Sequence, residues 1–157
     1  MFIRHFEPSD AEALAVLFHT SVQQLGSRHY TSEQLKAWSA SKPDPQNYLR
    51  RASDRSLLVA IDSMDTVAGY GDLEPDGHID HIYCRPDLAG TGVGSAVYRA
   101  IEVAGRRAGI EVLFVEASEG SRRLFARHGF VTEGRNDFCI NGVAIHNYRM
   151  SKRLNRR

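Results

Sequence analysis

Apolar residues recur along the chain with two different periods, and each period predicts one kind of element. Short apolar or alternating runs predict strands over residues 2–7, 56–61, 66–74, 78–84, 110–117, 132–140 and 143–151. Apolar residues at helical spacing predict helices that begin near residues 10, 31, 93 and 121. These helices are expected to end at Gly26, near Trp38, at Gly105 or Gly109, and at Gly129. The predicted order is β-α-α-β-β-β-α-β-α-β-β, an α/β protein.

Turn residues indicate which of these strands are neighbours. Pro75 and Gly77 within residues 74–77 favour a tight turn, so strand 78–84 is expected to run antiparallel to strand 66–74. Asn141-Gly142 is a strong hairpin signal between the last two strands. Residues 41–47 contain two prolines and are expected to form a loop. The sequence has no internal repeat or linker, so we expect one domain over residues 1–157.

Charge and composition narrow the class of protein. The chain has 157 residues with 20 Lys and Arg against 19 Asp and Glu, a net charge of +1. This balance argues against nucleic acid or a membrane surface as a partner, because both attract a basic excess. The sequence has neither a run of 18 apolar residues nor the apolar core of a signal peptide, which predicts a cytoplasmic location. Cys84 and Cys139 lie in apolar stretches and are expected to be reduced.

Seven histidines raise the question of a metal site, and their spacing argues against one. His78 and His81 are three apart on a predicted strand and should face opposite sides. No pair of cysteines has zinc-ligand spacing. We therefore expect no metal.

Three alternating glycines, Gly90, Gly92 and Gly94, separate a predicted strand from a predicted helix. Glycines let a ligand approach the backbone, and the free N–H groups of a helix start attract anions, above all phosphate. The P-loop tripeptide and the dinucleotide-binding fingerprint are both absent. The loop therefore predicts a pyrophosphate site of another type, and a glycine-rich turn without a ligand is the alternative.

Three segments resemble the GCN5-related N-acetyltransferase family. Residues 89–94 match the loop Q/R-x-x-G-x-G/A except that Ala89 replaces Gln or Arg. Ile82 to Pro86 resembles the strand before that loop, and Ser118 to Phe130 resembles Asn-x-x-Ala-x-x-x-Tyr-x-x-x-Gly-Phe. The ending of Asn147 to Met150 is similar to the YafP-like branch of small bacterial members. The resemblance implies a mixed, mostly antiparallel twisted sheet with helices on both faces.

The family resemblance also implies acetyl-CoA as co-substrate, bound where the strand before the loop parts from the strand after the helix. Pantetheine would pair with the backbone of Ile82 and Cys84, and a backbone N–H near Ile82 or Tyr83 would meet the oxyanion. Ser118 stands where the family often has an asparagine, and Phe125 where many members have a tyrosine that protonates the departing thiolate. The pyrophosphate would take N–H groups from Ala89, Gly90, Thr91, Gly92, Val93, Gly94 and Ser95. Arg85, Arg122 and Arg123 could meet CoA phosphates or be solvated.

An amine acceptor must lose a proton before it attacks, so a general base is needed. Counted back from the loop, the catalytic glutamate of histone-acetylating members corresponds to His78. Strand alternation would place Asp80 on the same face as His78, as a base with its orienting carboxylate, and Glu74 is a third candidate. Each of the three could instead be a solvated edge residue. Cys84 as an acyl-accepting nucleophile is a rival mechanism that its apolar strand disfavours.

The resemblance thus implies an enzyme that transfers an acetyl group to a primary amine of a small molecule or peptide by direct attack in a ternary complex. Tyr30, Trp38 and Tyr148 are candidates for the acceptor pocket, although Trp38 at helical spacing could be a core residue. A catalytically weak or inactive acyl-CoA-binding module, acting as a sensor or partner protein, is the first alternative. A nucleotide-binding protein without CoA is the second. A homodimer is possible through the terminal hairpin.

Overall fold

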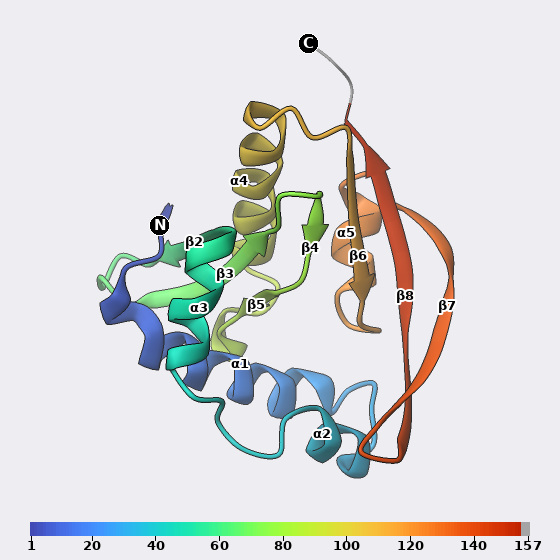
Figure 1. Cartoon of the computed structure of the whole chain (residues 1–157). Helices are drawn as coiled ribbons and strands as arrows, with labels where there is room; N and C mark the ends of the chain where they lie inside the picture. The colour runs from blue at the N-terminus through green and yellow to red at the C-terminus, as the bar shows by residue number, and fades with distance from the viewer. Residues whose placement is uncertain (155–157) are drawn as a thin grey trace.

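The computed structural model describes residues 1–154, which form two four-stranded sheets (Figure 1). The first sheet is antiparallel and has the order β1 (Phe2–His5), β2 (Ser56–Ile61), β3 (Val67–Leu73) and β5 (Ile82–Cys84). The second has the order β4 (His78–Ile79), β6 (Val112–Ala117), β8 (Val143–Arg153) and β7 (Val131–Ile140). Only the pairing of β4 with β6 is parallel among these strands, so the mostly antiparallel sheet is confirmed.

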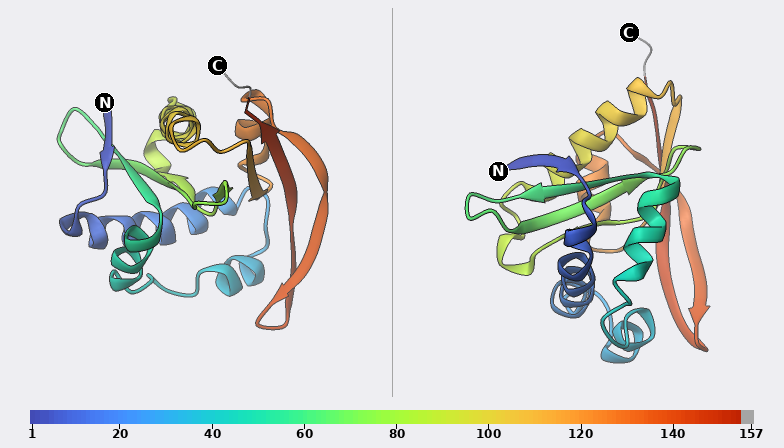
Figure 2. Two further views of the ribbon diagram at one scale, coloured as in Figure 1. Left: turned by 45° about the horizontal axis from the view of Figure 1, so that its top comes forward. Right: turned by 60° about the vertical axis from the view of Figure 1, so that its left-hand side comes forward.

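Helices cover both faces of the first sheet, as predicted. The helices of residues 1–154 are α1 (Ala11–Gly26), α2 (Ser32–Trp38), α3 (Gln46–Asp54), α4 (Val93–Arg107) and α5 (Arg122–Arg127), with 3-10 turns at Pro8–Asp10 and Pro86–Leu88. Of these, α1, α3 and α4 contact the first sheet. Figure 2 shows α1 and α3 on the face of the first sheet opposite to α4. Within the described residues, no helix has the length and apolar character needed to cross a bilayer.

Alternation along β2 accounts for this layering. Leu57 and Val59 pack in the core that contains α1, whereas Leu58 and Ala60 belong to the core that contains α4. The helix α4 lies so close to β3 that a Cβ atom at Gly71 would meet Cγ1 of Val97 at 2.8 Å. Glycine in β3 therefore permits the close packing that places the first turn of α4 beside β5.

The predicted strand over residues 78–84 is divided in the structure, and the division shapes the molecule. The carboxylate of Asp72 is fully buried, and its Oδ1 accepts the backbone N–H groups of Asp80 at 2.9 Å and His81 at 2.8 Å. These bonds stabilise a break, so that β4 joins the second sheet and β5 stays with the first. Below the β4–β6 pairing the two sheets part, and the open edge of β5 faces the gap.

A helix that the sequence did not predict, α3, follows the proline-rich loop. Asp44 accepts the backbone N–H of Gln46 at 2.9 Å, so the expected loop over residues 41–47 ends two residues early. Tyr48 of this helix is buried, and its hydroxyl lies 3.0 Å from that of Tyr70 on β3. The observed order therefore has one helix more than predicted and two short strands in place of the predicted strand over residues 78–84.

Candidate active site

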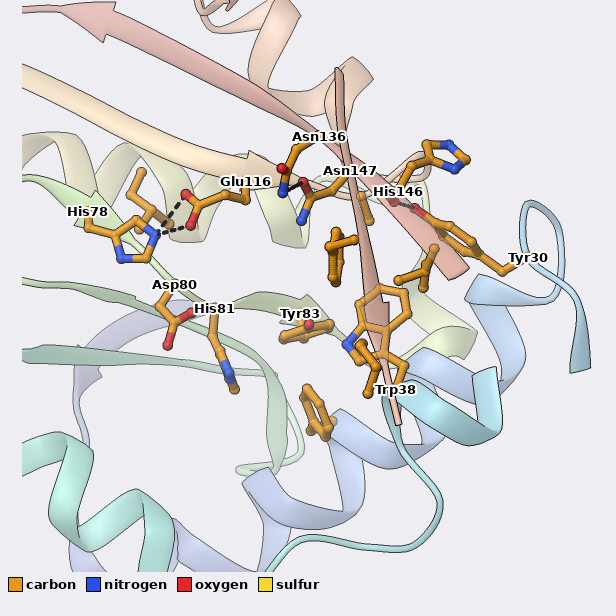
Figure 3. A pocket seen from close by; sticks show the side chains of 16 residues that line it. Tyr30, Trp38, His78, Asp80, His81, Tyr83, Glu116, Asn136, His146 and Asn147 are labelled. Carbon is orange, nitrogen blue, oxygen red and sulfur yellow. Dashed lines mark hydrogen bonds and ion pairs between the residues drawn. The ribbon is translucent and has the colours of Figure 1, made fainter. Parts of the chain in front are cut away.

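Two adjoining cavities lie where the sheets part. The loop cavity, of about 430 Å³, lies between β5, the glycine loop, the end of α1 and the start of α5. The hairpin cavity, of about 340 Å³, lies between the β4–β5 break, Glu116 of β6 and the β7–β8 hairpin (Figure 3). Both cavities are bordered by the same four residues, Tyr30, Trp38, Tyr83 and Ser118, which we call the shared wall.

The glycine loop gives the loop cavity the character of an anion site. Gly90 and Gly92 have φ angles of +78° and +98°, and an added Cβ at either would meet no atom within 4 Å. The helix α4 begins directly afterwards, and the N–H groups of its first turn have no intrahelical partner. Arg28 and Arg127 also line this cavity. The backbone and these charges fit a pyrophosphate.

Most residues predicted to bind the cofactor line the loop cavity. They are Ile82, Tyr83, Cys84, Ala89, Gly90, Gly92, Gly94, Ser95 and Ser118. Burial and charge disfavour a reactive Cys84 thiolate, because burial, and then the nearby carboxylate of Asp87, raise the pKa of this thiol.

The side chains of three predicted cofactor residues do not line the loop cavity, although Thr91 and Val93 were predicted only for their backbone N–H groups. Phe125 is fully buried and packs edge-on against Tyr98 and Phe130, so it belongs to the core rather than to the wall of either cavity. Val93 is also a core residue, and the hydroxyl of Thr91 donates to the carbonyl of Leu88 at 2.6 Å. Phe125 and Val93 are buried because the apolar faces of α5 and α4, on which they lie, turn toward the sheets.

None of the three arginines suggested for CoA phosphates lines the loop cavity. Arg85 is held by Asp62 and Asp87, each at 2.9 Å. The guanidinium of Arg122 lies 4.1 Å from the centre of the Tyr148 ring. Arg127, which the sequence analysis did not single out, lines the loop cavity instead.

His78 lies at one end of the hairpin cavity between two glutamates. Its Nδ1 is 2.9 Å from Oε1 of Glu74, and its Nε2 is 2.9 Å from Oε2 of Glu116. The ring is stacked on Phe114 at 4.9 Å. Burial alone would lower the pKa of His78, but the hydrogen bond with Glu74 and the charge of Glu116 outweigh it, and the pKa is raised. Carboxylates at both ring nitrogens therefore favour the protonated form of this imidazole.

Asp80 does not form the predicted pair with His78. Its Oδ2 accepts Nη1 of Arg51 at 2.6 Å and lies 3.5 Å from Nη1 of Arg55. Burial raises the pKa of Asp80, but the neighbouring cations more than offset this, and the pKa is lowered. The strand alternation that would place Asp80 beside His78 is lost because β4 ends at Ile79. The carboxylates that contact His78 are Glu74 and Glu116.

His81 lines the same cavity but has a different environment. Its Nδ1 lies 2.9 Å from the Tyr70 hydroxyl, and burial followed by the charge of Arg51 lowers its pKa to about 3. The imidazole of His81 is therefore neutral at physiological pH. Figure 3 shows the ring of His78 beside Glu116, whereas the ring of His81 points away from that pair. Among residues 1–154, no three His, Cys, Asp or Glu side chains are grouped to hold a metal ion.

Of the three aromatic residues predicted for an acceptor pocket, two lie in the shared wall. The hydroxyl of Tyr30 accepts the backbone N–H of Glu119 at 2.8 Å and donates to the carbonyl of His146 at 3.1 Å. Trp38 packs edge-on against Tyr30, with ring centres 5.5 Å apart. Tyr148 instead donates its hydroxyl to Glu119 at 3.0 Å and lines neither cavity.

Several residues of the hairpin cavity were missed by the sequence analysis. Glu116 had a visible signal, because it is the only charged residue in the buried strand β6. Asn136 and Asn147, joined by a bond of 3.1 Å, and His146 had none, because only the folding of the β7–β8 hairpin over the cavity brings them there. Figure 3 shows these side chains on the side of the cavity opposite to His81.

Comparisons with known proteins agree with this geometry. A family model described as Acetyltransferase (GNAT) domain matches residues 27–152. The chain is similar to the uncharacterized N-acetyltransferase YafP of Escherichia coli K12, with 26% identity over 94% of this chain and 93% of YafP. It is also similar to the crystal structure of a GCN5-related N-acetyltransferase, titled aminotransferase class-II, from Rhodopseudomonas palustris. That match has 34% identity, a TM-score of 0.89 and coverage of 98% and 95% of the two chains.

A third match shows the fold alone. It is a GNAT superfamily phosphinothricin acetyltransferase from Sinorhizobium meliloti, solved in complex with acetyl-CoA. The two chains are 18% identical with a TM-score of 0.77, over 98% of this chain and 88% of the other.

Proposed function

The chain belongs to the GNAT acetyltransferase family, and on that basis we propose that it transfers the acetyl group of acetyl-CoA to a primary amine of a small molecule or peptide. The amine attacks directly in a ternary complex. The observation that carries the proposal is the shared wall, because it lets a donor in the loop cavity and an acceptor in the hairpin cavity meet. The proposal places this function in one N-acetyltransferase domain over residues 1–157. Residues 155–157 lie outside the described residues.

Acetyl-CoA binding is assigned to the loop cavity. The two open glycines and the start of α4 are the proposed pyrophosphate cradle, with Arg28 and Arg127 at its edge. The free edge of β5 offers the backbone of Ile82 and Cys84 to pantetheine. Because the net charge is only +1, a local cradle rather than a general basic field must hold this polyanion. Bound there, acetyl-CoA would supply a thioester that is open to attack by an amine.

His78 is the proposed general base. Its contacts with Glu74 and Glu116 favour the protonated ring, so the imidazole can accept a proton from an ammonium acceptor. The neutral acceptor then attacks the acyl carbon at the shared wall, where a backbone N–H of Ile82 or Tyr83 is the proposed oxyanion donor. Asp80 is paired with Arg51 and Arg55, so its charge is balanced within the protein and it is not proposed as a second base.

One observation favours a second function, an acyl-CoA-binding module that is catalytically weak or inactive. Phe125 has no hydroxyl and lies in the core, so it offers no proton to a departing thiolate. A thiol has a pKa of about 8.5, well below the value of about 10.4 for a lysine-type amine, so the thiolate still departs readily near neutral pH. The absence of a proton donor at this position therefore weakens catalysis without removing it.

Release of free CoA thiol from acetyl-CoA separates the two functions. We expect release with at least one member of a panel of polyamines, amino sugars, amino acids and peptides. We expect His78→Gln to lower kcat about a hundredfold, the lower end of general acid–base contributions. Tight CoA binding without thiol release across the panel would establish the binding module. A cytoplasmic location and a homodimer stay predictions.

A further inference from the structure

A group that assists the departing sulfur must lie where the two cavities meet. When the C–S bond breaks, the sulfur gains an electron pair, and a nearby hydroxyl lowers the barrier by donating a proton to it. Phe125 cannot do so. The shared wall contains three hydroxyl groups, those of Tyr30, Tyr83 and Ser118.

Two of these hydroxyls are already engaged within the protein. Tyr30 donates to the His146 carbonyl, and this bond ties α1 and α2 to the hairpin. Ser118 donates to Oγ of Ser121 at 3.0 Å and accepts the backbone N–H of Ser121 at 3.2 Å. Neither is free to donate to a ligand without breaking a bond that shapes the cavities.

The hydroxyl of Tyr83 is different. Among residues 1–154 it has no hydrogen-bond partner, and it is not sealed from the cavities. Figure 3 shows Tyr83 between Trp38 and the His78–Glu116 pair. Its ring is fixed by edge contacts to Phe18 at 5.0 Å and His81 at 5.3 Å. The structure therefore holds a donor with no acceptor of its own at the boundary of the cavities.

Burial keeps the hydroxyl of Tyr83 in its protonated form. Burial, and after it the charge of Asp80, raise the pKa of this phenol well above its ordinary value. The hydroxyl therefore stays protonated over the whole range in which His78 titrates.

We propose that Tyr83 is a catalytic residue whose Oη protonates the sulfur of CoA as the acetyl group leaves. The inference rests on the proposed function. The amine nitrogen forms its bond to the acyl carbon, the C–S bond breaks, and its electron pair goes to sulfur, which takes the Tyr83 proton. The phenolate then regains a proton from the nitrogen of the new amide. Together with the proton that His78 removes from the ammonium acceptor, this gives amide, free thiol and one released proton.

The test compares Tyr83→Phe with Tyr98→Phe, using acetyl-CoA and the best amine of the panel. Tyr98 is a buried tyrosine that lines neither cavity, so Tyr98→Phe removes a hydroxyl without touching the site. We expect Tyr83→Phe to lower kcat about tenfold to a hundredfold, modest for a general acid because a thiolate is a good leaving group. The KM for acetyl-CoA should stay within about threefold, the solvent deuterium isotope effect on kcat should shrink, and Tyr98→Phe should keep the wild-type kcat.

Three results would overturn the proposal. Tyr83→Phe with a kcat within about twofold of wild type means that the hydroxyl does not assist departure. A raised KM for acetyl-CoA with unchanged kcat means that it only binds. A wild-type protein without thiol release refutes the proposed function and this inference with it, whereas the first two results leave that function intact.

Discussion

The break between β4 and β5 should depend on the side chain of Asp72. We predict that Asp72→Ala destabilises the protein much more than Asp72→Asn does. The wild-type carboxylate accepts two backbone N–H groups, from Asp80 and His81, through a single oxygen. An asparagine keeps an oxygen at that place, whereas an alanine leaves both N–H groups without their partner.

The structure gives the size of the difference. An unsatisfied buried N–H costs about 1–3 kcal/mol, so losing two costs about 2–4 kcal/mol once some water enters beside the exposed Asp80. At about 2–4 °C per kcal/mol for a chain of this length, the Tm of Asp72→Ala should lie about 4–16 °C below that of Asp72→Asn. The asparagine itself should cost little, because burial raises the pKa of Asp72, which means that the site disfavours the charge. Arg51 and Arg55 keep other carboxylate partners, Asp80 among them.

Urea unfolding and calorimetry of the two variants provide the stability measurement, and the KM for acetyl-CoA reports on the cavity. Because the break exposes the edge of β5, Asp72→Ala should also raise this KM more than Asp72→Asn does. Equal stability of the two variants, to within about 0.5 kcal/mol, would refute the role of these hydrogen bonds.

Two further predictions concern the base and the glycine loop. Glu116 raises the pKa of His78, and His78 must be neutral to act as a base. Glu116→Gln should therefore shift the acidic limb of the kcat/KM pH profile to lower pH. A shift to higher pH would exclude His78 as the base. Gly92→Ala should raise the KM for acetyl-CoA severalfold, because its Cβ would project into the loop cavity. Gly109→Ala is the matched control, with a φ of +74° and open space, so it should share the strain of about 1 kcal/mol but not the change in KM.

Local signals in the sequence predicted most of the elements. Gly26 ends α1, and Thr31 caps α2 by accepting the N–H of Gln34 at 3.1 Å, both as expected. The Asn141-Gly142 turn joins β7 and β8. Such signals act within a few residues and therefore survive the folding of the rest of the chain.

The features that the sequence analysis did not predict have a different cause, because they depend on contacts between segments that are distant in the chain. The helix α3 has a polar sequence, and only the burial of Tyr48 against Tyr70 of β3 reveals its inner face. The strand over residues 78–84 is broken by Asp72, whose side chain gives no local sign of that role. For the same reason His78 contacts Glu116 rather than Asp80, because β6 lies beside β4 only in the folded sheet.

The candidate site likewise has one part that local sequence signals predict and one part that depends on distant contacts. The glycine loop could be predicted because alternating glycines before a helix have one physical use, the close approach of an anion. The acceptor side could not, because its wall is assembled from α1, α2, the β4–β5 break and the hairpin. Family resemblance placed Phe125 at the cofactor, whereas its own apolar character places it in the core.

Initial-rate kinetics with the best amine of the panel test the central claim most directly, that donor and acceptor occupy adjoining cavities at the same time. Double-reciprocal plots at several fixed acetyl-CoA concentrations should give intersecting lines, and the enzyme incubated with acetyl-CoA alone should carry no acetyl group by mass spectrometry. Parallel lines, together with an acetylated Cys84, would contradict direct attack at the shared wall and establish a covalent intermediate instead.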